Sequence, residues 1–269
     1  MRKTPLTILL VATFLLTIWG CQQKVLFTDR QQTLLIPSSQ LLSLGEETYA
    51  AQLQSSTVIT QGVGVAMVNR VAARLIPVVE HDLQKLGKTE QLGQLHWAFS
   101  LISDNKTLNA YCLPGGKVVV YSGILSLVAK DDELAVVLSH EIAHALAEHG
   151  NERMSEQLIL QAGSLVLDKV LEKNPAETRQ VFQNIYGVGT SVGVALPHSR
   201  EQESEADKIG LVLMTQAGYD PNAAITFWDK MKASGASKPP EFLSTHPADE
   251  RRVADLKAYI PQAMNYKTF

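Results

Sequence analysis

One stretch of the sequence, residues 130–150, constrains the fold more than any other part of the chain. Two aspartates at its start favour the beginning of a helix, and Gly150 favours the end. Leucine and valine residues between them recur at helical spacing, so we expect one amphipathic helix across the stretch. Such a helix places His140 and His144, which are four residues apart, on the same face.

Glu141 lies beside the two histidines and completes a His-Glu-x-x-His motif. Two imidazoles one helical turn apart can bind one zinc ion, and the adjacent carboxylate is placed to accept a proton from an attacking water molecule. The motif also occurs by chance, often in loops, but here it falls within a well-signalled helix. We therefore predict His140 and His144 as metal ligands and Glu141 as a catalytic base.

A catalytic zinc site needs a third protein ligand and an open coordination position. The pattern in which a third histidine follows on the same segment is excluded, because Ala147 and Gly150 stand where it requires glycine and histidine. His149 follows His144 by five residues, which places it off the ligand face of the helix. The third ligand is therefore expected to be a carboxylate on a later helix.

Residues 199–218 begin with several acids and continue as an amphipathic helix. Glu203 and Asp207 fall on its apolar stripe, whereas Glu201 and Glu205 point away from the stripe and are expected to be solvated. We predict Glu203 as the third ligand and Asp207 as a residue that hydrogen-bonds a ligating histidine. A run of acids at a helix start is also a common surface feature, but the upstream motif lacks a third ligand and favours our interpretation.

Residues 95–102, 108–113 and 117–122 are rich in β-branched and aromatic residues and are separated by turn signals, which predicts three strands. We expect them to form a small antiparallel sheet beside the zinc-binding helix. Its edge strand could bind an extended peptide by main-chain hydrogen bonds; alternatively, the sheet only covers the helix. Cys112, within the second strand, is expected to be a small buried residue.

Helical spacing elsewhere predicts packing helices, of which the second contains Pro77 and is expected to kink or end there. The small residues within 186–194 are expected to allow close helix packing. The predicted fold class is therefore α+β and mainly helical. The expected packing helices cover residues 43–53, 60–86, 152–173, 176–195, 221–233 and 249–259.

The first twenty residues differ from the rest, because two basic residues precede an apolar run too short to be trusted as a membrane span. We predict a signal peptide over residues 1–20. Residues 18–21 are similar to a bacterial lipoprotein signal, with an unusual Trp19, so Cys21 is the expected lipidation site. Gln22 follows in place of aspartate, which by the sorting rule of such lipoproteins indicates the outer membrane. The alternatives are an ordinary cleaved signal and an uncleaved anchor.

Further motifs extend the pattern along the chain. They are Asn109-Ala110, Pro114-Gly115-Gly116-Lys117, His140-Glu141-Ile142-Ala143-His144, Ser199-Arg200, Glu203-Ser204-Glu205-Ala206-Asp207, Thr245-His246-Pro247 and Arg252. With these motifs the chain, from about Glu46 to Leu256, resembles the HtpX-, BepA- and LoiP-type zinc metallopeptidases, which are gluzincins of bacterial envelopes with relatives in mitochondria.

The resemblance implies a gluzincin, or zincin-like, domain that binds one zinc ion per chain through His140, His144 and Glu203. It also implies that His246 lies near the zinc, either as a catalytic residue that stabilises the transition state or as a group that fills the open coordination position. Two histidines with one carboxylate favour zinc over other divalent metals.

Other residues of these motifs are expected around the same site. Asn109, Gly115 and Gly116 are the positions at which we expect substrate binding. Arg200 and Arg252 are expected to pair with carboxylates near the metal. The expected domains are a lipoprotein signal peptide over 1–20, the lipidated cysteine and a tether over 21–42, the zinc metallopeptidase domain over 43–260 and a tail over 261–269.

Together these features lead us to expect a zinc metalloendopeptidase that is lipid-anchored in the periplasm and degrades misfolded or unassembled envelope proteins. The outer-membrane assembly machinery is a candidate partner, and the net charge of −3 gives no sign of nucleic-acid binding. One alternative is a latent, zinc-containing chaperone or assembly factor for outer-membrane proteins. A structural lipoprotein with a vestigial motif ranks last, because every required ligand type is present.

Overall fold

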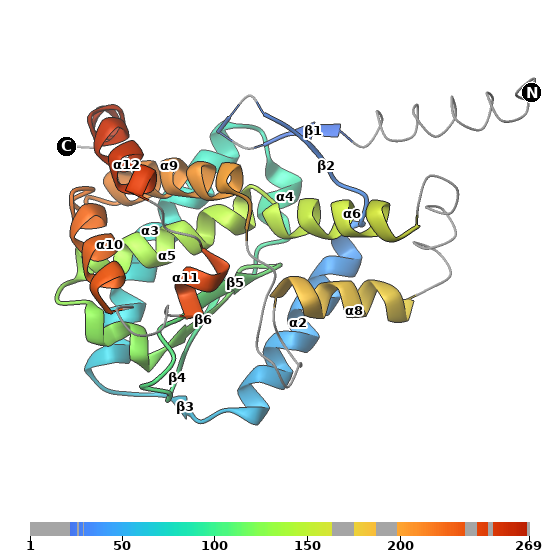
Figure 1. Ribbon diagram of the computed structural model, residues 1–269, viewed down its shortest axis with the longest axis horizontal. Helices are drawn as coiled ribbons and strands as arrows, with labels where there is room; N and C mark the ends of the chain where they lie inside the picture. Colours follow the sequence, from blue (N-terminus) through green and yellow to red (C-terminus); the bar gives the residue numbers. More distant parts are fainter. Residues whose placement is uncertain are drawn as a thin grey trace, which may run out of the picture.

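The computed structural model describes residues 22–25, 27–28, 30–162, 175–186, 198–234, 241–246 and 250–267. It confirms the predicted fold class, a mainly helical domain with a small sheet beside the helix that carries the histidine pair (Figure 1). The predictions for residues 1–21, including the signal peptide and the lipidation of Cys21, lie outside the described residues. So do those for 163–174, 187–197 and Pro247.

The helix predicted over 130–150 is two helices. The first ends at Leu146, Glu148 adopts a positive φ of 53°, and the second begins at His149. Pro77 lies inside a continuous helix and does not end it. The helices are α2 (Ser38–Ser55), α3 (Val63–Lys85), α4 (Thr89–Gly93), α5 (Asp131–Leu146), α6 (His149–Ala162), α8 (Pro175–Tyr186), α9 (Arg200–Gln216), α10 (Ala223–Ser234), α11 (Glu241–Thr245) and α12 (Glu250–Ala263), with 3-10 turns η1 (Ser122–Leu127) and η3 (Met264–Tyr266).

The central sheet has four strands in the order β3-β4-β6-β5, which are β3 (Val58–Ile59), β4 (Ala98–Ile102), β5 (Ala110–Leu113) and β6 (Lys117–Tyr121). The pair β5–β6 is antiparallel, as predicted, and β3, a strand that we did not predict, is antiparallel to β4. The pair β4–β6 is parallel, because the chain that leaves β4 passes the position of β6 before it turns back as the β5–β6 hairpin. This crossover leaves β5 at the edge of the sheet.

Helices cover both faces of the sheet (Figure 1). On one face, Val118 and Val120 of β6 join the main core with apolar residues of α3 and α5. On the other face, Leu113 of β5 packs in a second cluster with residues of α2, α6 and α8. The sheet is thus held between two helical layers, and its edge strand β5 contacts the histidine-bearing helix α5.

Helices α5 and α9 cross closely, and this crossing positions the site. Gly210 of α9 lies against the backbone of Ser139 and His140, where an added Cβ would meet atoms at 3.2 Å. The start of α9 is fixed by a capping box, in which the Ser199 hydroxyl accepts from the Gln202 backbone N–H and the Gln202 side chain accepts from the Ser199 backbone N–H. Both features fix the first turn of α9 relative to α5.

The segment that we predicted to be a tether packs on the domain instead. Strands β1 (Gln22–Lys24) and β2 (Gln31–Thr33) form an antiparallel hairpin, and Val25 in its turn is only 1% exposed. The backbone N–H of Leu35 donates to the Ser155 hydroxyl of α6 at 2.9 Å. The described residues between 22 and 36 therefore belong structurally to the folded unit, and we refer to the described residues between 22 and 33 as the N-terminal hairpin.

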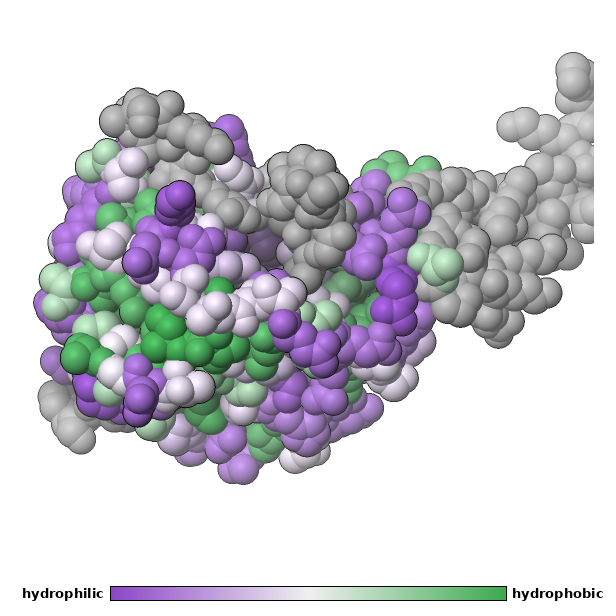
Figure 2. All heavy atoms as spheres, turned by 90° about the horizontal axis from the view of Figure 1, so that it is seen from below, coloured by the Kyte–Doolittle hydropathy of each residue, from purple (hydrophilic) through white to green (hydrophobic). Residues whose placement is uncertain are grey.

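The side of the molecule on which β3 and β4 lie shows a band of apolar residues between more hydrophilic flanks (Figure 2). Val63, at the start of α3, is largely exposed. Within the residues that the structure describes, no helix combines the length and apolar character needed to cross a bilayer.

Candidate metal centre

Three elements bring four potential metal ligands together. His140 and His144 come from α5 and Glu203 from the first turn of α9, and His246 directly follows α11. One ligand atom from each of the four residues lies within 4.8 Å of all the others, and all four side chains are buried. Glu203 Oε1 is 3.2 Å from His144 Nε2 and 2.9 Å from His246 Nδ1. The sequence-predicted ligand set thus converges, joined by His246.

The donor atoms of this cluster fit a bound cation. The Nε2 atoms of His140 and His144 lie 3.0 Å apart, and each ring directs its Nδ1 atom to a partner outside the cluster. If Nδ1 carries the proton, two nitrogen lone pairs and the Glu203 carboxylate face one another. These groups repel unless a positive ion lies between them. Two imidazoles and one carboxylate are the donor set that zinc takes in catalytic sites.

Asp207 lies where the sequence analysis placed it, within hydrogen-bond distance of a ligating histidine. Its Oδ1 is 3.1 Å from His140 Nδ1. Arg252 of α12 binds Asp207 with two hydrogen bonds of 2.7 and 2.8 Å, and its third nitrogen is 2.6 Å from Glu203 Oε2. The guanidinium also stacks over Trp228 at 3.7 Å from the ring centre. Arg252 therefore links the predicted ligand Glu203 to Asp207, which contacts the other predicted ligand His140.

The Nδ1 atom of His144 contacts another histidine, whereas that of His140 contacts an aspartate. His144 Nδ1 is 2.8 Å from Nδ1 of His149, and His149 Nε2 is 3.2 Å from Glu205 Oε2. The expectation that Glu205 would be solvated is wrong: the side chain is buried because the N-terminal hairpin covers it. Glu201 is exposed, as expected.

Glu141 faces a cavity of about 130 Å³ beside the cluster. The cavity is also lined by His144, His246 and the β5 segment. Glu141 Oε1 is buried and accepts no hydrogen bond from the described residues, although His246 Nε2 lies 3.4 Å away. A carboxylate held this way, without a fixed donor, is free to accept a proton from a group that enters the cavity.

The electrostatic environment shifts the pKa values of the two histidines of α5 in opposite directions. Burial lowers the pKa of His140, but the charge of Glu203 and the bond to Asp207 outweigh it and raise the pKa to about 9. Burial dominates at His144 and holds its pKa well below the usual range. Burial also raises the pKa of Glu141. Burial opposes ionisation of Glu203, yet the charges of His246 and Arg252 keep its pKa well below the usual range.

The expected substrate-binding positions lie at the edge strand and its turn. Asn109 and Gly115 line the cavity. Gly116 is not among the described residues that line it; it adopts a positive φ of 79° and packs against Trp97. Cys112 is buried, as predicted, and burial raises the pKa of its thiol. Arg200 is exposed.

Two residues near the site were not singled out from the sequence as functional. The His198 ring lies 4.0 Å from the His144 ring and stacks on the His246 ring at 5.1 Å. Arg153 of α6 contacts His198 and lines the cavity. Together with His149, these contacts gather five of the seven histidines of the chain in one place. That concentration of histidine after residue 139 is the sequence signal that could have indicated them.

Comparison with known proteins agrees with this geometry. The sequence profile of peptidase family M48 matches residues 69–260. The chain is 37% identical over 187 residues to the mitochondrial metalloendopeptidase OMA1 of Schizosaccharomyces pombe, which covers 69% of this chain and 53% of that protein. It is 31% identical over 249 residues to the mitochondrial metalloendopeptidase OMA1 of Homo sapiens, with 89% and 46% covered.

A bacterial relative matches over a similar span. The chain is 29% identical over 263 residues to the beta-barrel assembly-enhancing protease of Escherichia coli, which covers 92% of this chain and 51% of that protein. The chain spans about half the length of these curated relatives. The family profile covers most of the chain, including the four converging side chains and Glu141, and the chain therefore belongs to peptidase family M48.

Proposed function

We propose that this chain is a zinc-dependent endopeptidase of the bacterial cell envelope. One observation carries the proposal. The ligand atoms of His140, His144 and Glu203 converge, and Glu141 faces the cavity beside them. The residues fit zinc by donor type, and membership of a peptidase family supports the hydrolysis of peptide bonds. The metalloendopeptidase names of the relatives support cleavage within chains.

Each residue of the site has a part in the proposed reaction. His140, His144 and Glu203 would hold zinc, which when bound supplies a Lewis acid that activates water and polarises the scissile carbonyl. Glu141 accepts the proton of the attacking water and delivers it to the leaving amine. Asp207 keeps His140 in one tautomer, and Arg252 holds Asp207 in place.

Strand β5 supplies the surface on which an extended substrate would lie. Among the described strands, β5 pairs only with β6, and the Asn109 carbonyl accepts from the Tyr121 N–H on that side. Because hydrogen bonds alternate along an antiparallel pair, the peptide groups of Ala110 and Cys112 point to the opposite side, towards the cavity. The Ala110 N–H already donates to the Asn109 side-chain oxygen at 2.9 Å, so an extended peptide would pair with the Ala110 carbonyl and the peptide group of Cys112, which favours unfolded or exposed segments as substrates.

The envelope location rests on the N-terminal sequence and on one relative. The pattern of residues 1–21 supports a signal peptide with lipidation of Cys21, which would hold the enzyme on the periplasmic side of the outer membrane. The E. coli relative is named for beta-barrel assembly, whereas the OMA1 relatives are named as mitochondrial. The proposed substrates are misfolded or unassembled envelope proteins, and the outer-membrane assembly machinery is a proposed partner.

The first test compares the wild-type protein with Glu141→Gln for zinc content and casein cleavage. We expect one zinc ion in both proteins and cleavage by the wild type only, because the amide cannot accept the proton. Glu90→Gln, on the exposed helix α4, is the control and should cleave like the wild type. Cleavage by the Glu141→Gln protein at the wild-type rate would reject the mechanism.

The location is tested by Cys21→Ala in bacterial cells. Loss of membrane association, together with loss of labelling by a radioactive fatty acid, is the expected result. A variant that remains in the outer-membrane fraction would reject the lipid anchor.

A latent chaperone or assembly factor is the second candidate, and the position of His246 favours it. His246 Nδ1 lies within the ligand cluster, 3.2 Å from His140 Nε2, so this histidine can fill the coordination position that substrate requires. His246→Ala separates the two roles. Faster cleavage of casein supports latency, whereas lost cleavage with retained zinc supports a catalytic role.

A further inference from the structure

A chain of buried side chains runs from the ligand His144 to the N-terminal hairpin. The first step is the contact of 2.8 Å between Nδ1 of His144 and Nδ1 of His149. The second joins His149 Nε2 to Glu205 Oε2 at 3.2 Å. His149 is fully buried at the start of α6, and Glu205 is buried two residues after the predicted ligand Glu203 in α9.

One arrangement of protons satisfies every contact of this chain. Nε2 of His144 faces the metal cluster, so its Nδ1 carries the proton and donates to Nδ1 of His149. His149 then carries its proton on Nε2 and donates it to the Glu205 carboxylate. The neutral imidazole of His149 thus accepts on one side and donates on the other, which fixes the tautomer of His144 that leaves Nε2 available for a metal.

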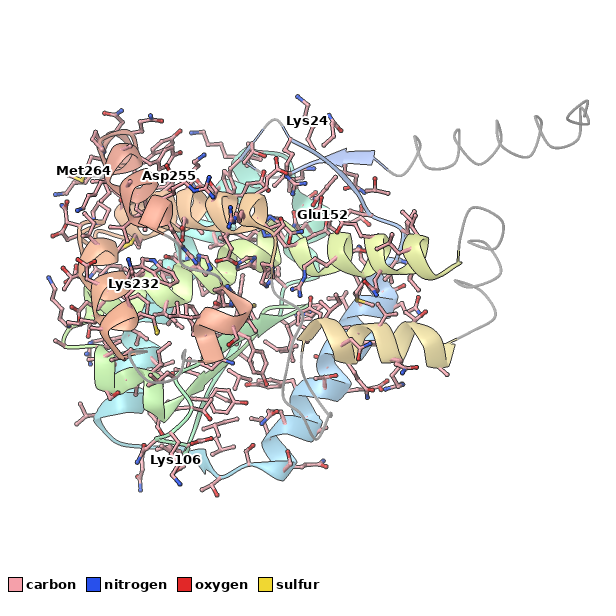
Figure 3. All side chains as sticks on the ribbon, in the orientation of Figure 1. Lys24, Lys106, Glu152, Lys232, Asp255 and Met264 are labelled. Atoms are coloured by element: carbon pink, nitrogen blue, oxygen red, sulfur yellow. The ribbon has the colours of Figure 1, made fainter. Side chains whose placement is uncertain are left out.

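The far end of the chain belongs to the N-terminal hairpin. Arg30 donates through Nε to Glu205 Oε2 at 2.8 Å and through its terminal nitrogens to both oxygens of Glu152 on α6. Thr28 of the same hairpin donates to Glu205 Oε1 at 3.0 Å. Figure 3 labels Glu152 on the side of α6 that faces the hairpin, whose strand β1 ends at Lys24.

The two carboxylates depend on Arg30 for charge balance. Glu152 and Glu205 are buried on neighbouring helices, and one guanidinium binds both. Without it, two like charges would be left in a poorly solvated position, and Glu205 would move away from His149. The position of His149 therefore depends on whether the hairpin is in place.

We propose that the N-terminal hairpin is a positioning element of the metal centre, in which Arg30 holds Glu205, Glu205 holds His149 and His149 orients the ligand His144. The inference rests on the proposed zinc site and adds a residue from outside the region that matches the family profile, since Arg30 precedes residue 69. The other histidine, His140, is held by Asp207 and Arg252, which both lie inside that region. Zinc affinity is thereby coupled to the packing of the N-terminal hairpin on the domain.

The test measures zinc affinity of the detergent-solubilised full chain by competition with a chromophoric chelator. His149→Ala should weaken zinc binding about 10- to 100-fold, and Arg30→Ala about 10-fold, as is usual for residues that orient a ligand. His149→Gln should restore most of the affinity, because an amide also offers one acceptor and one donor. The absorption bands of the cobalt-substituted protein should shift in His149→Ala and return in His149→Gln.

Arg70→Ala is the matched control. Arg70 binds both oxygens of Asp131 at 2.7 Å, so its loss removes the same kind of fork-like ion pair without contact to a histidine. Zinc affinity of Arg70→Ala should equal that of the wild type. The melting temperature of each metal-free variant shows that it is folded before its affinity is compared.

Two results would overturn the inference. One is wild-type zinc affinity in both His149→Ala and Arg30→Ala; the other is an equal loss in Arg70→Ala, which would indicate a general effect of stability. Failure of the proposed function gives a different pattern, in which the wild-type protein binds zinc and responds to the His149 and Arg30 substitutions but cleaves no peptide.

Discussion

At the scale of single residues, the site is organised by what lies behind each ligand. The Nδ1 atom of His140 contacts Asp207, and the Nδ1 atom of His144 contacts His149. The spacing of the motif and the stripe of the later helix were sufficient to place His140, His144, Glu203 and Asp207. They were not sufficient for Glu205, because helix periodicity shows which side faces the main core and cannot show that a distant segment covers the opposite side.

Arg252 is the residue whose loss should affect stability most. It binds two buried carboxylates, Asp207 and Glu203, so Arg252→Ala removes the guanidinium that both share in the metal-free protein. We expect a loss of about 3–5 kcal/mol in the free energy of unfolding. Urea denaturation in the presence of a chelator measures it.

Arg179→Ala provides the comparison for this measurement. Arg179 forms an exposed pair with Glu47, and its removal should leave the free energy of unfolding close to that of the wild type. Similar losses in the two variants would contradict the view that the pairs of Arg252 are desolvated.

At the scale of secondary-structure elements, the crossing of α5 and α9 and the edge position of β5 determine the site. The first sets how closely Glu203 approaches the two histidines, and the second gives the cavity a strand with peptide groups directed into it. Sequence patterns predicted both helices and the strand. The parallel pairing of β4 with β6 could not be predicted, because it depends on the path of the connection and both strands read alike in either direction.

Gly210→Ala tests the helix crossing. A methyl group there would lie 3.2 Å from backbone atoms of α5, which cannot move as a side chain can. Overpacking of this kind costs about 1–3 kcal/mol and exceeds the gain of about 1 kcal/mol in helix propensity. We expect lower unfolding free energy and weaker zinc binding.

The control for that substitution is Gly93→Ala in α4, where an added methyl group meets nothing within 4 Å. This variant should be as stable as the wild type or slightly more stable. If Gly210→Ala behaved in the same way, the crossing would not be limited by contact at this glycine.

The role of β5 predicts an alternating response to substrate modification. Methylation of a substrate peptide nitrogen removes one main-chain hydrogen bond, which contributes about 0.5–1.5 kcal/mol. We expect kcat/KM to fall roughly 2- to 12-fold when the methyl group is on a residue that pairs with β5, and much less at the neighbouring residues. An equal response at consecutive positions would argue against pairing with the strand.

At the scale of the whole molecule, two residues that are far apart in the described part of the chain support the same site. Arg30 binds Glu205, which contacts His149, the partner of His144. Arg252 binds Asp207, which contacts His140. The place of the N-terminal hairpin could not be read from its own polar sequence, because the groups that hold it, Glu152 and Glu205, are supplied more than a hundred residues later.

Removal of zinc should therefore lower the stability of the whole domain. With free zinc at 100 times its dissociation constant, binding adds about 2.7 kcal/mol to the free energy of unfolding. For a domain of this size we expect the melting temperature to fall by roughly 5–10 °C on chelation. Glu203→Gln should melt at nearly the same temperature with and without zinc, and an unchanged wild-type melting temperature would contradict a metal held between α5, α9 and α11.

The stacking of Arg252 on Trp228 also gives the protein an optical reporter. The indole ring of Trp228 lies 6.3 Å from the His140 ring, so its fluorescence senses whatever that imidazole binds. A cobalt ion taken up in place of zinc absorbs in the visible range and, at such short range, would quench the emission of this tryptophan. Loading of the centre could then be followed in real time, without any label and without a substrate.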